Sequence, residues 1–150
     1  MISNRTDCHW RVALTRYLLA SVVLHLVWEV VQLPLYTIWR TGTPREIAFA
    51  IAHCTVGDVM IAALSLGAAI VIAGRRTWPT KNYAAVAACA IVLGVSYTAF
   101  SEWLNLSRSN WAYTELMPVI QGVGLSPLLQ WVIVPGLAFL CVHSKTTSSR

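Results

Sequence analysis

Hydrophobic residues along the chain gather into four long blocks that are separated by short polar segments. The blocks cover approximately residues 17–39, 47–74, 83–106 and 125–143. Each block is close to the roughly 20 residues that an α-helix needs to cross a bilayer. Little of the chain is left outside the blocks. The pattern therefore predicts an all-α fold, a polytopic membrane protein with four transmembrane helices in a single domain over residues 1–150.

Local signals predict where these helices begin and bend. The segment Thr43-Pro44-Arg45-Glu46 offers a capping hydroxyl, a proline at the first helical position and a glutamate three residues after the threonine, as a capping box does. Pro34 and Pro135 predict bends in the first and last helices. Segment 107–118 mixes aromatic and polar residues, which is typical of the lipid headgroup region. Because the first block is long and no small-residue cleavage site follows it, we interpret it as a span rather than a signal peptide.

Composition and charge support a membrane location and predict an orientation. Hydrophobic residues make up 57% of the chain and charged residues only 11%, against about 25% charged in soluble domains. Basic residues favour cytoplasmic loops, and the termini with the 75–81 loop hold more of them than the opposite side does. The first group is Arg5, Arg11, Arg16, Arg75, Arg76, Lys81, Lys145 and Arg150, and the second is Arg40, Arg45 and Arg108. We expect a multi-pass protein of the bacterial inner membrane with both termini in the cytoplasm, and the net charge of +5 gives no reason to expect nucleic-acid binding.

The first block contains polar residues at positions where lipid-facing side chains would be costly. In "LHLVWEVVQLPLY", residues 24–36, the polar residues are His25, Glu29, Gln32 and Tyr36, at spacings of four, three and four. These spacings place them on one stripe of a helix. An ionised carboxylate in the middle of a bilayer costs about 2.5–3.5 kcal/mol. We therefore expect the stripe to face the other helices.

Helix rise of about 1.5 Å per residue predicts the depth of each polar group. Counted from the midpoint of each block toward the periplasm, Glu29, Asp58 and Tyr97 lie within about 4 Å of the middle. Gln32 and Gln130 follow at about 6 Å, and His53 and Glu102 at about 11 Å. The depths predict an inner tier of Glu29, Asp58 and Tyr97 and an outer tier of His53 and Glu102 capped by Asn105, in a funnel open to the periplasm.

These tiers favour a site that binds a metal ion, a proton or a small polar molecule. His53, Glu102 and Asp58 form a plausible ligand set for a divalent metal. With an open coordination position, the metal could activate water for a membrane hydrolase in which Glu102 and Asp58 are catalytic. Without a metal, acids at stepped depths would form a proton or cation path, as in a small transporter. In both cases the predicted ligand-binding residues are Glu29, Gln32, Tyr97, Asn105 and Gln130.

Other interpretations remain open at this point. The depths of His25 and His53 differ by about 15 Å, which argues against a haem held by two histidines. The polar groups could instead be a structural network, because hydrogen bonds between membrane helices contribute about 0.6 kcal/mol each. In that case the protein would be a non-catalytic subunit or assembly factor, docked on a larger membrane complex or on a second copy of itself. The sequence decides neither whether the protein is an enzyme nor what its substrate is.

Overall fold

The computed structural model describes residues 3–74 and 78–147. It contains four long helices: α1 (Ser3–Gln32), α3 (Pro44–Ala69), α4 (Tyr83–Ser107) and α5 (Leu125–Thr147). Shorter elements are η1 (Leu33–Leu35), α2 (Ile38–Thr41), a π-helical turn η2 (Ile70–Gly74) that extends α3, and a hairpin of β1 (Val119–Ile120) and β2 (Val123–Gly124). The chain is therefore an all-α bundle with one small hairpin.

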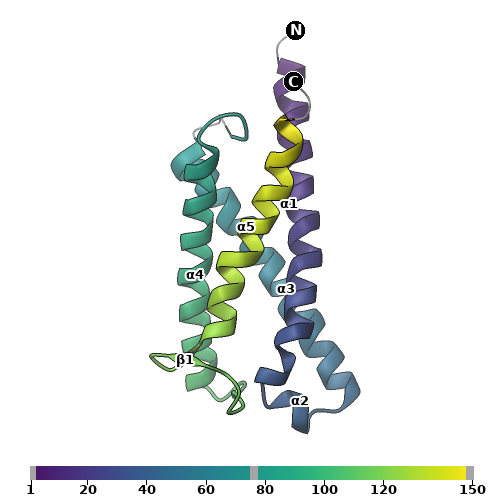
Figure 1. Ribbon diagram of the computed structural model, residues 1–150, viewed down its shortest axis with the longest axis vertical. Helices are drawn as coiled ribbons and strands as arrows, with labels where there is room; N and C mark the ends of the chain where they lie inside the picture. The colour runs from purple at the N-terminus through teal and green to yellow at the C-terminus, as the bar shows by residue number, and fades with distance from the viewer. Residues whose placement is uncertain (1–2, 75–77, 148–150) are drawn as a thin grey trace.

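The four long helices form a closed ring in which each packs against two others. α1 contacts α3 and α5, and α4 contacts the same two helices from the opposite side. Figure 1 shows the chain ends at one end of the bundle, with α2 and β1 at the other. We call these the terminal end and the hairpin end.

The predicted elements exist, with corrected boundaries. All four long helices contain stretches that are long and apolar enough to cross a membrane: Trp10–Leu35, Pro44–Gly74, Tyr83–Ser107 and Leu125–His143. The first helix starts earlier than predicted and ends at Gln32, because Pro34 follows within a 3-10 turn. The capping box at Thr43 is present, with Glu46 N–H donating to the threonine hydroxyl. α5 continues through Pro135. Three basic residues used to predict the orientation, Arg75, Arg76 and Arg150, lie outside the described residues.

The interior of the bundle changes from apolar to polar along its length. Toward the terminal end, the buried residues are mostly apolar, among them Tyr17, Leu66, Val86, Ala138, Phe139 and Val142, although Ser65 of α3 is buried there too. Toward the hairpin end, each long helix buries polar side chains, among them Glu29 on α1, Thr55 on α3, Glu102 on α4 and Gln130 on α5. Apolar packing therefore holds the helices together toward the terminal end, whereas buried polar side chains also meet toward the hairpin end.

The outer surface is strongly apolar. Large side chains such as Val31, Phe49, Leu64 and Val71 are at least 70% exposed. An apolar surface of this extent is unusual for a protein in water and is the surface that lipid chains would cover. The helices thus carry apolar side chains on their outer faces and polar side chains on part of their inner faces, as expected for a membrane bundle with a polar interior.

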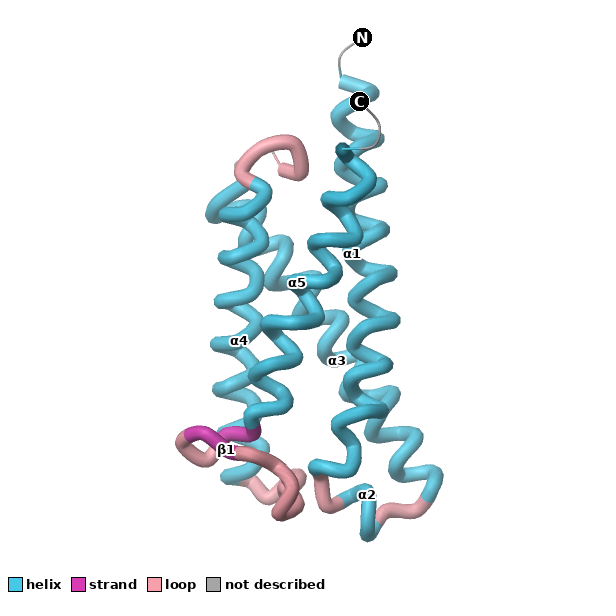
Figure 2. The backbone as a smooth tube through the Cα atoms, viewed as in Figure 1, coloured by secondary structure: helices cyan, strands magenta, loops and turns pink. Residues whose placement is uncertain are grey.

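Segment 108–124 folds across the hairpin end instead of forming a helix. Figure 2 shows this segment as loop and strand beside the end of α4. It pairs with the chain after α1: Thr114 N–H donates to Leu35 O at 2.9 Å, and Thr37 N–H donates to Ala112 O at 2.9 Å. On the surface, Arg40 donates to both carboxylate oxygens of Glu115, at 2.6 and 3.0 Å. The segment is therefore fastened to the η1–α2 region.

Candidate functional site

The polar stripe of α1 lies inside the bundle. His25, Glu29 and Gln32 are at most 8% exposed, as their helical spacing predicts. Ser21, one turn before His25, is also fully buried. Tyr36 falls beyond the end of α1 and is half-buried. The chain by itself therefore buries the three residues of the stripe that lie on α1.

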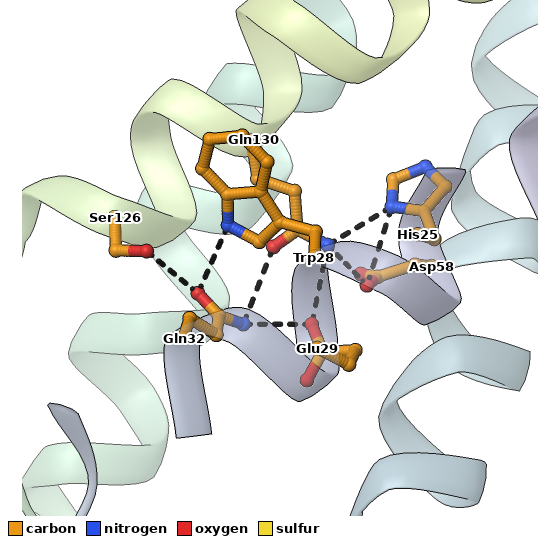
Figure 3. A network of polar contacts seen from close by, with 7 residues as sticks. All are labelled: His25, Trp28, Glu29, Gln32, Asp58, Ser126 and Gln130. Carbon is orange, nitrogen blue, oxygen red and sulfur yellow. Dashed lines mark hydrogen bonds and ion pairs between the residues drawn. The ribbon is translucent and has the colours of Figure 1, made fainter. Parts of the chain in front are cut away.

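Gln130 of α5 is the centre of a cluster that joins three helices. Its Nε2 atom lies 2.7 Å from Asp58 Oδ2, 2.9 Å from His25 Nδ1 and 3.1 Å from Glu29 Oε1. Gln32 Nε2 adds a 2.7 Å hydrogen bond to the same oxygen of Glu29. Figure 3 shows these side chains converging from α1, α3 and α5. We call His25, Glu29, Gln32, Asp58 and Gln130 the inner cluster.

The hydrogen bonds at the edge of the inner cluster determine how its two amides are oriented. The indole N–H of Trp28, which can only donate, bonds to Gln32 Oε1 at 3.2 Å, and the Ser126 hydroxyl bonds to the same oxygen at 2.9 Å (Figure 3). The NH₂ group of Gln32 must then face Glu29. Gln32 Nε2 also lies 3.5 Å from Gln130 Oε1, which leaves the NH₂ group of Gln130 facing the carboxylates and the imidazole.

This orientation determines which hydrogens the inner cluster shares. The Gln130 NH₂ group has two hydrogens, whereas three acceptor atoms lie around its nitrogen. His25 Nδ1 is also 3.4 Å from Asp58 Oδ2. Gln32 also donates to Glu29 Oε1, so the two hydrogens of Gln130 suffice for Asp58 and His25. The two amides therefore satisfy these contacts and hold two carboxylates and an imidazole close together.

Packing against Trp131 holds His25 in place. The two rings are 5.2 Å apart, and Trp131 is only 1% exposed. Gly94 of α4 also contacts the tryptophan and leaves no room for a side chain, because a Cβ atom there would lie 2.1 Å from the indole ring. A glycine at this position thus lets α4 approach Trp131, which in turn packs on the histidine.

A second polar group lies closer to the hairpin end, around Glu102 of α4. Glu102 is 7% exposed and accepts a short hydrogen bond from the Tyr113 hydroxyl. The same hydroxyl oxygen accepts the Gly124 N–H at 2.9 Å. A Cβ on Gly124 would lie 3.0 Å from the Tyr113 hydroxyl, so the glycine permits this contact. We call Tyr36, Glu102 and Tyr113 the capped cluster, because segment 108–124 covers it.

Tyr36 connects the capped cluster with the end of α1. Its ring lies edge-on to that of Tyr113, with 5.4 Å between the centroids, and the two residues form an isolated β-bridge. Burial raises the pKa of Tyr36, and the negative charges of Glu102 and Glu29 raise it further. Burial also raises the pKa of Tyr113, as does its hydrogen bond to Glu102. Both phenols therefore keep their protons at neutral pH.

The structure brings together part of the predicted inner tier. Glu29 and Asp58 both bond to Gln130, as the depths suggested. Tyr97 does not join them: its side chain is 52% exposed, whereas Gly94, Thr98 and Glu102 form the buried stripe of α4. One residue turns a helix by about 100°. The prediction that Tyr97 faces the interior was therefore wrong.

The predicted outer tier does not form. His53 is exposed and stacks on Phe49 at 5.6 Å, while Glu102 bonds to Tyr113. Five residues separate His53 from Asp58, a rotation of about 140° around the helix, so both cannot face inward. Asn105 donates to Ser101 O at 2.8 Å and accepts from Asn110, which is a local contact at the end of α4.

The arrangement does not support the predicted metal ligands. His53, Asp58 and Glu102 are not gathered around one point, and no group of three or more His, Cys, Asp or Glu side chains suited to a metal ion occurs in the described part of the chain. The chemistry that the inner cluster offers is instead that of hydrogen bonding and proton exchange between carboxylates and an imidazole.

Sequence reasoning missed several contributors to the two clusters. His25 was placed on the polar stripe but left out of the site, although it is four residues from Glu29, a spacing that signals a shared face. Tyr113 could not have been found, because only the fold of segment 108–124 brings it to Glu102.

Comparison with protein-family models, curated proteins and solved structures gave no match.

Proposed function

We propose that this chain is a small multi-pass membrane protein that binds and releases protons at the inner cluster, in proton-linked transport of a small polar solute or ion. Ionisable side chains in the interior of membrane bundles mark proton and ion pathways. The proposal requires no metal ion and no cofactor.

The observation that carries the proposal is the environment of Gln130 Nε2. The carboxylates of Glu29 and Asp58 and the imidazole of His25 lie within 3.1 Å of this nitrogen. Among the described residues, the ion pairs are His25–Asp58 and the surface pair Arg40–Glu115, so no lysine or arginine neutralises Glu29 and Asp58. A desolvated carboxylate without a cation is stabilised by taking up a proton. The cluster can therefore exist in a protonated, nearly neutral state and in a deprotonated, anionic state.

The proposal is tested by following the carboxyl groups directly. Infrared difference spectra of the purified protein, recorded between acidic and alkaline buffer, should contain the carbonyl band of a protonated carboxyl group. Glu29→Gln and Asp58→Asn should each change this band, because each replaces a carboxyl group by an amide of similar shape. The exposed Glu115→Gln is the matched control for removing a carboxyl group elsewhere.

Two results would contradict the proposal. One is a wild-type spectrum in which the bands lost in Glu29→Gln and Asp58→Asn do not respond to pH. The other is a pair of variants that unfold at lower temperature and retain solute movement in vesicles. The second result would favour a structural network, and with it the subunit or assembly-factor function.

The orientation is a separate proposal. We infer that the chain lies in the bacterial inner membrane with both ends in the cytoplasm, which is supported by the excess of basic residues in the tails and the 75–81 loop. The hairpin end would then face the periplasm. A single cysteine placed at Lys81, in a background without the other cysteines, should be protected from a membrane-impermeant thiol reagent in intact cells. Labelling in intact cells would reverse the orientation.

A further inference from the structure

We propose that protons reach the inner cluster from the hairpin end, through Glu102 and a water-bridged step past Tyr36 and Thr55. This inference rests on the proposed function of the inner cluster and adds a second proton-carrying group and a direction. Glu102 is the outer group of the path, and the Glu29–Asp58 pair is its destination.

The positions of the two clusters suggest the path. Tyr36 follows Gln32 by four residues, just after the end of α1, and its ring packs on Tyr113, which bonds to Glu102. Tyr36 therefore follows the inner cluster along the chain and packs beside the partner of Glu102, and the charges of both Glu102 and Glu29 act on its phenol. Its phenol, which is protonated at neutral pH, can donate one proton while it accepts another.

An unpartnered hydroxyl provides a second, independent observation. Thr55 of α3 is 8% exposed, and its Oγ1 atom is buried without a hydrogen-bond partner. It precedes Asp58 by three residues, on the side of α3 that is nearer the hairpin end. Buried hydroxyl groups in proteins are nearly always bonded to protein or to water. A water molecule at Thr55 would satisfy the hydroxyl and link the two clusters.

The charged and titratable groups around this region come from three sides. Tyr36 is close to Glu29 of α1, to Cys54 of α3, and to Glu102 and Tyr113. The charge of Asp58 also acts on Glu102. The Trp111 indole nitrogen is buried beside Glu102 but makes no hydrogen bond of ordinary geometry. No basic side chain is among these neighbours, so no positive charge fixes Glu102 in its charged form.

The proton step conserves atoms and charge. A protonated Glu102 gives its proton to the Tyr36 hydroxyl oxygen, directly or through the water at Thr55. The phenol passes its own hydrogen to the carboxylate of Glu29. Glu102 is left ionised and Glu29 becomes neutral, while Tyr36 is unchanged at the end of the step. Rotation of the phenol O–H then restores the starting geometry.

The test separates the amount of proton binding from its rate. After a rapid change of pH, the infrared band assigned to the inner cluster by Glu29→Gln is followed in wild type, Tyr36→Phe, Glu102→Gln and Thr55→Val. We expect the final amplitude to be unchanged and the rate to fall by about tenfold or more, the scale of losing a positioned proton-transfer group. The controls are Tyr97→Phe and Ser96→Ala, which change exposed hydroxyl groups on α4 and should leave the rate unchanged.

The outcomes distinguish this inference from the proposed function. If the wild-type band does not respond to pH, the proposed function fails and the path fails with it. If the band responds but all three variants follow wild-type kinetics, the path alone is overturned. Should Tyr36→Phe or Glu102→Gln fail to fold, Thr55→Val decides the question, because valine preserves the shape of threonine and removes only the hydroxyl group.

Discussion

The inner cluster and the capped cluster both bury carboxylates, but they are built in different ways. The inner cluster consists of side chains on three long helices, and its α1 members follow helical spacing. The capped cluster joins one helix residue, Glu102, to Tyr113 in a segment without regular helix. The spacing of residues within one helix determines which side chains share a face, whereas the position of a side chain in a loop depends on where the two ends of the loop are held. The first kind of site is therefore more visible in a sequence than the second.

The clusters also differ in how their hydrogen bonds are balanced. At Glu102, the Tyr113 hydroxyl accepts from Gly124 N–H and donates to a single carboxylate. At Gln130, two carboxylates and an imidazole surround one amide nitrogen. The capped cluster thus has one carboxylate with a phenol beside it, whereas the inner cluster has two carboxylates that share one amide. This contrast is why we assign proton binding to the inner cluster and proton delivery to the capped one.

The largest effect on stability should come from removing the centre of the inner cluster. Gln130→Leu takes both N–H groups from two carboxylates and an imidazole in a buried place, and we expect a loss of about 3 kcal/mol in the free energy of unfolding. Val132→Ala, at a half-exposed position of the same helix, serves as the control. Unfolding in detergent micelles measures both. A Gln130→Leu variant as stable as wild type would show that the cluster does not organise the bundle.

A smaller effect is expected from crowding the helix contact that supports His25. Gly94→Ala places a Cβ atom 2.1 Å from the Trp131 ring, and the forced repacking should destabilise the protein by about 2 kcal/mol. Gly67→Ala is the matched control, because nothing lies within 4 Å of a Cβ at that position. Unfolding of both variants in detergent would decide the question. Equal stability of the two would contradict the close approach of α4 to Trp131.

The capped cluster should be less sensitive than the inner one. Tyr113→Phe removes the hydroxyl group between Glu102 and Gly124, and we expect a loss of about 1 kcal/mol. Tyr97→Phe changes an exposed tyrosine and should have no measurable effect in the same unfolding experiment. If Tyr113→Phe is more destabilising than Gln130→Leu, the ranking of the two clusters is reversed.

The smallest effect should come from the surface ion pair that fastens segment 108–124. Hydrogen bonding by Arg40 lowers the pKa of Glu115 below its usual 4.5. The pair therefore contributes fully above pH 4.5 and loses its contribution as pH falls through the lower pKa of the folded state. Arg40→Gln should weaken this dependence only slightly, because exposed pairs are screened by water. Comparing the stability of Arg40→Gln and wild type across acidic pH checks the direction, and a dependence that strengthens in the variant would contradict it.

The candidate site could be predicted in part, and its errors share one cause. Counting helix rise gave similar depths for Glu29, Asp58 and Tyr97, but depth does not say which way a side chain faces. Neighbouring buried residues define that direction: Thr98 and Glu102 are buried on α4, and Tyr97 is not. The same reasoning applied to α3 separates His53 from Asp58. The helical period within each helix therefore predicts the direction in which a side chain faces, which the comparison of depths between helices does not.

The sequence by itself determined the four long apolar helices, the capping box at Thr43 and the buried polar stripe of α1, because these depend on local composition, capping chemistry and helical period. Only the tertiary structure decided which polar groups meet. Gln130 lies 105 residues from His25 in the chain and 2.9 Å from it in space, and Tyr113 reaches Glu102 through a loop held at η1 and α2. Such contacts depend on how helices rotate and pack against each other, which the period of a single helix does not specify.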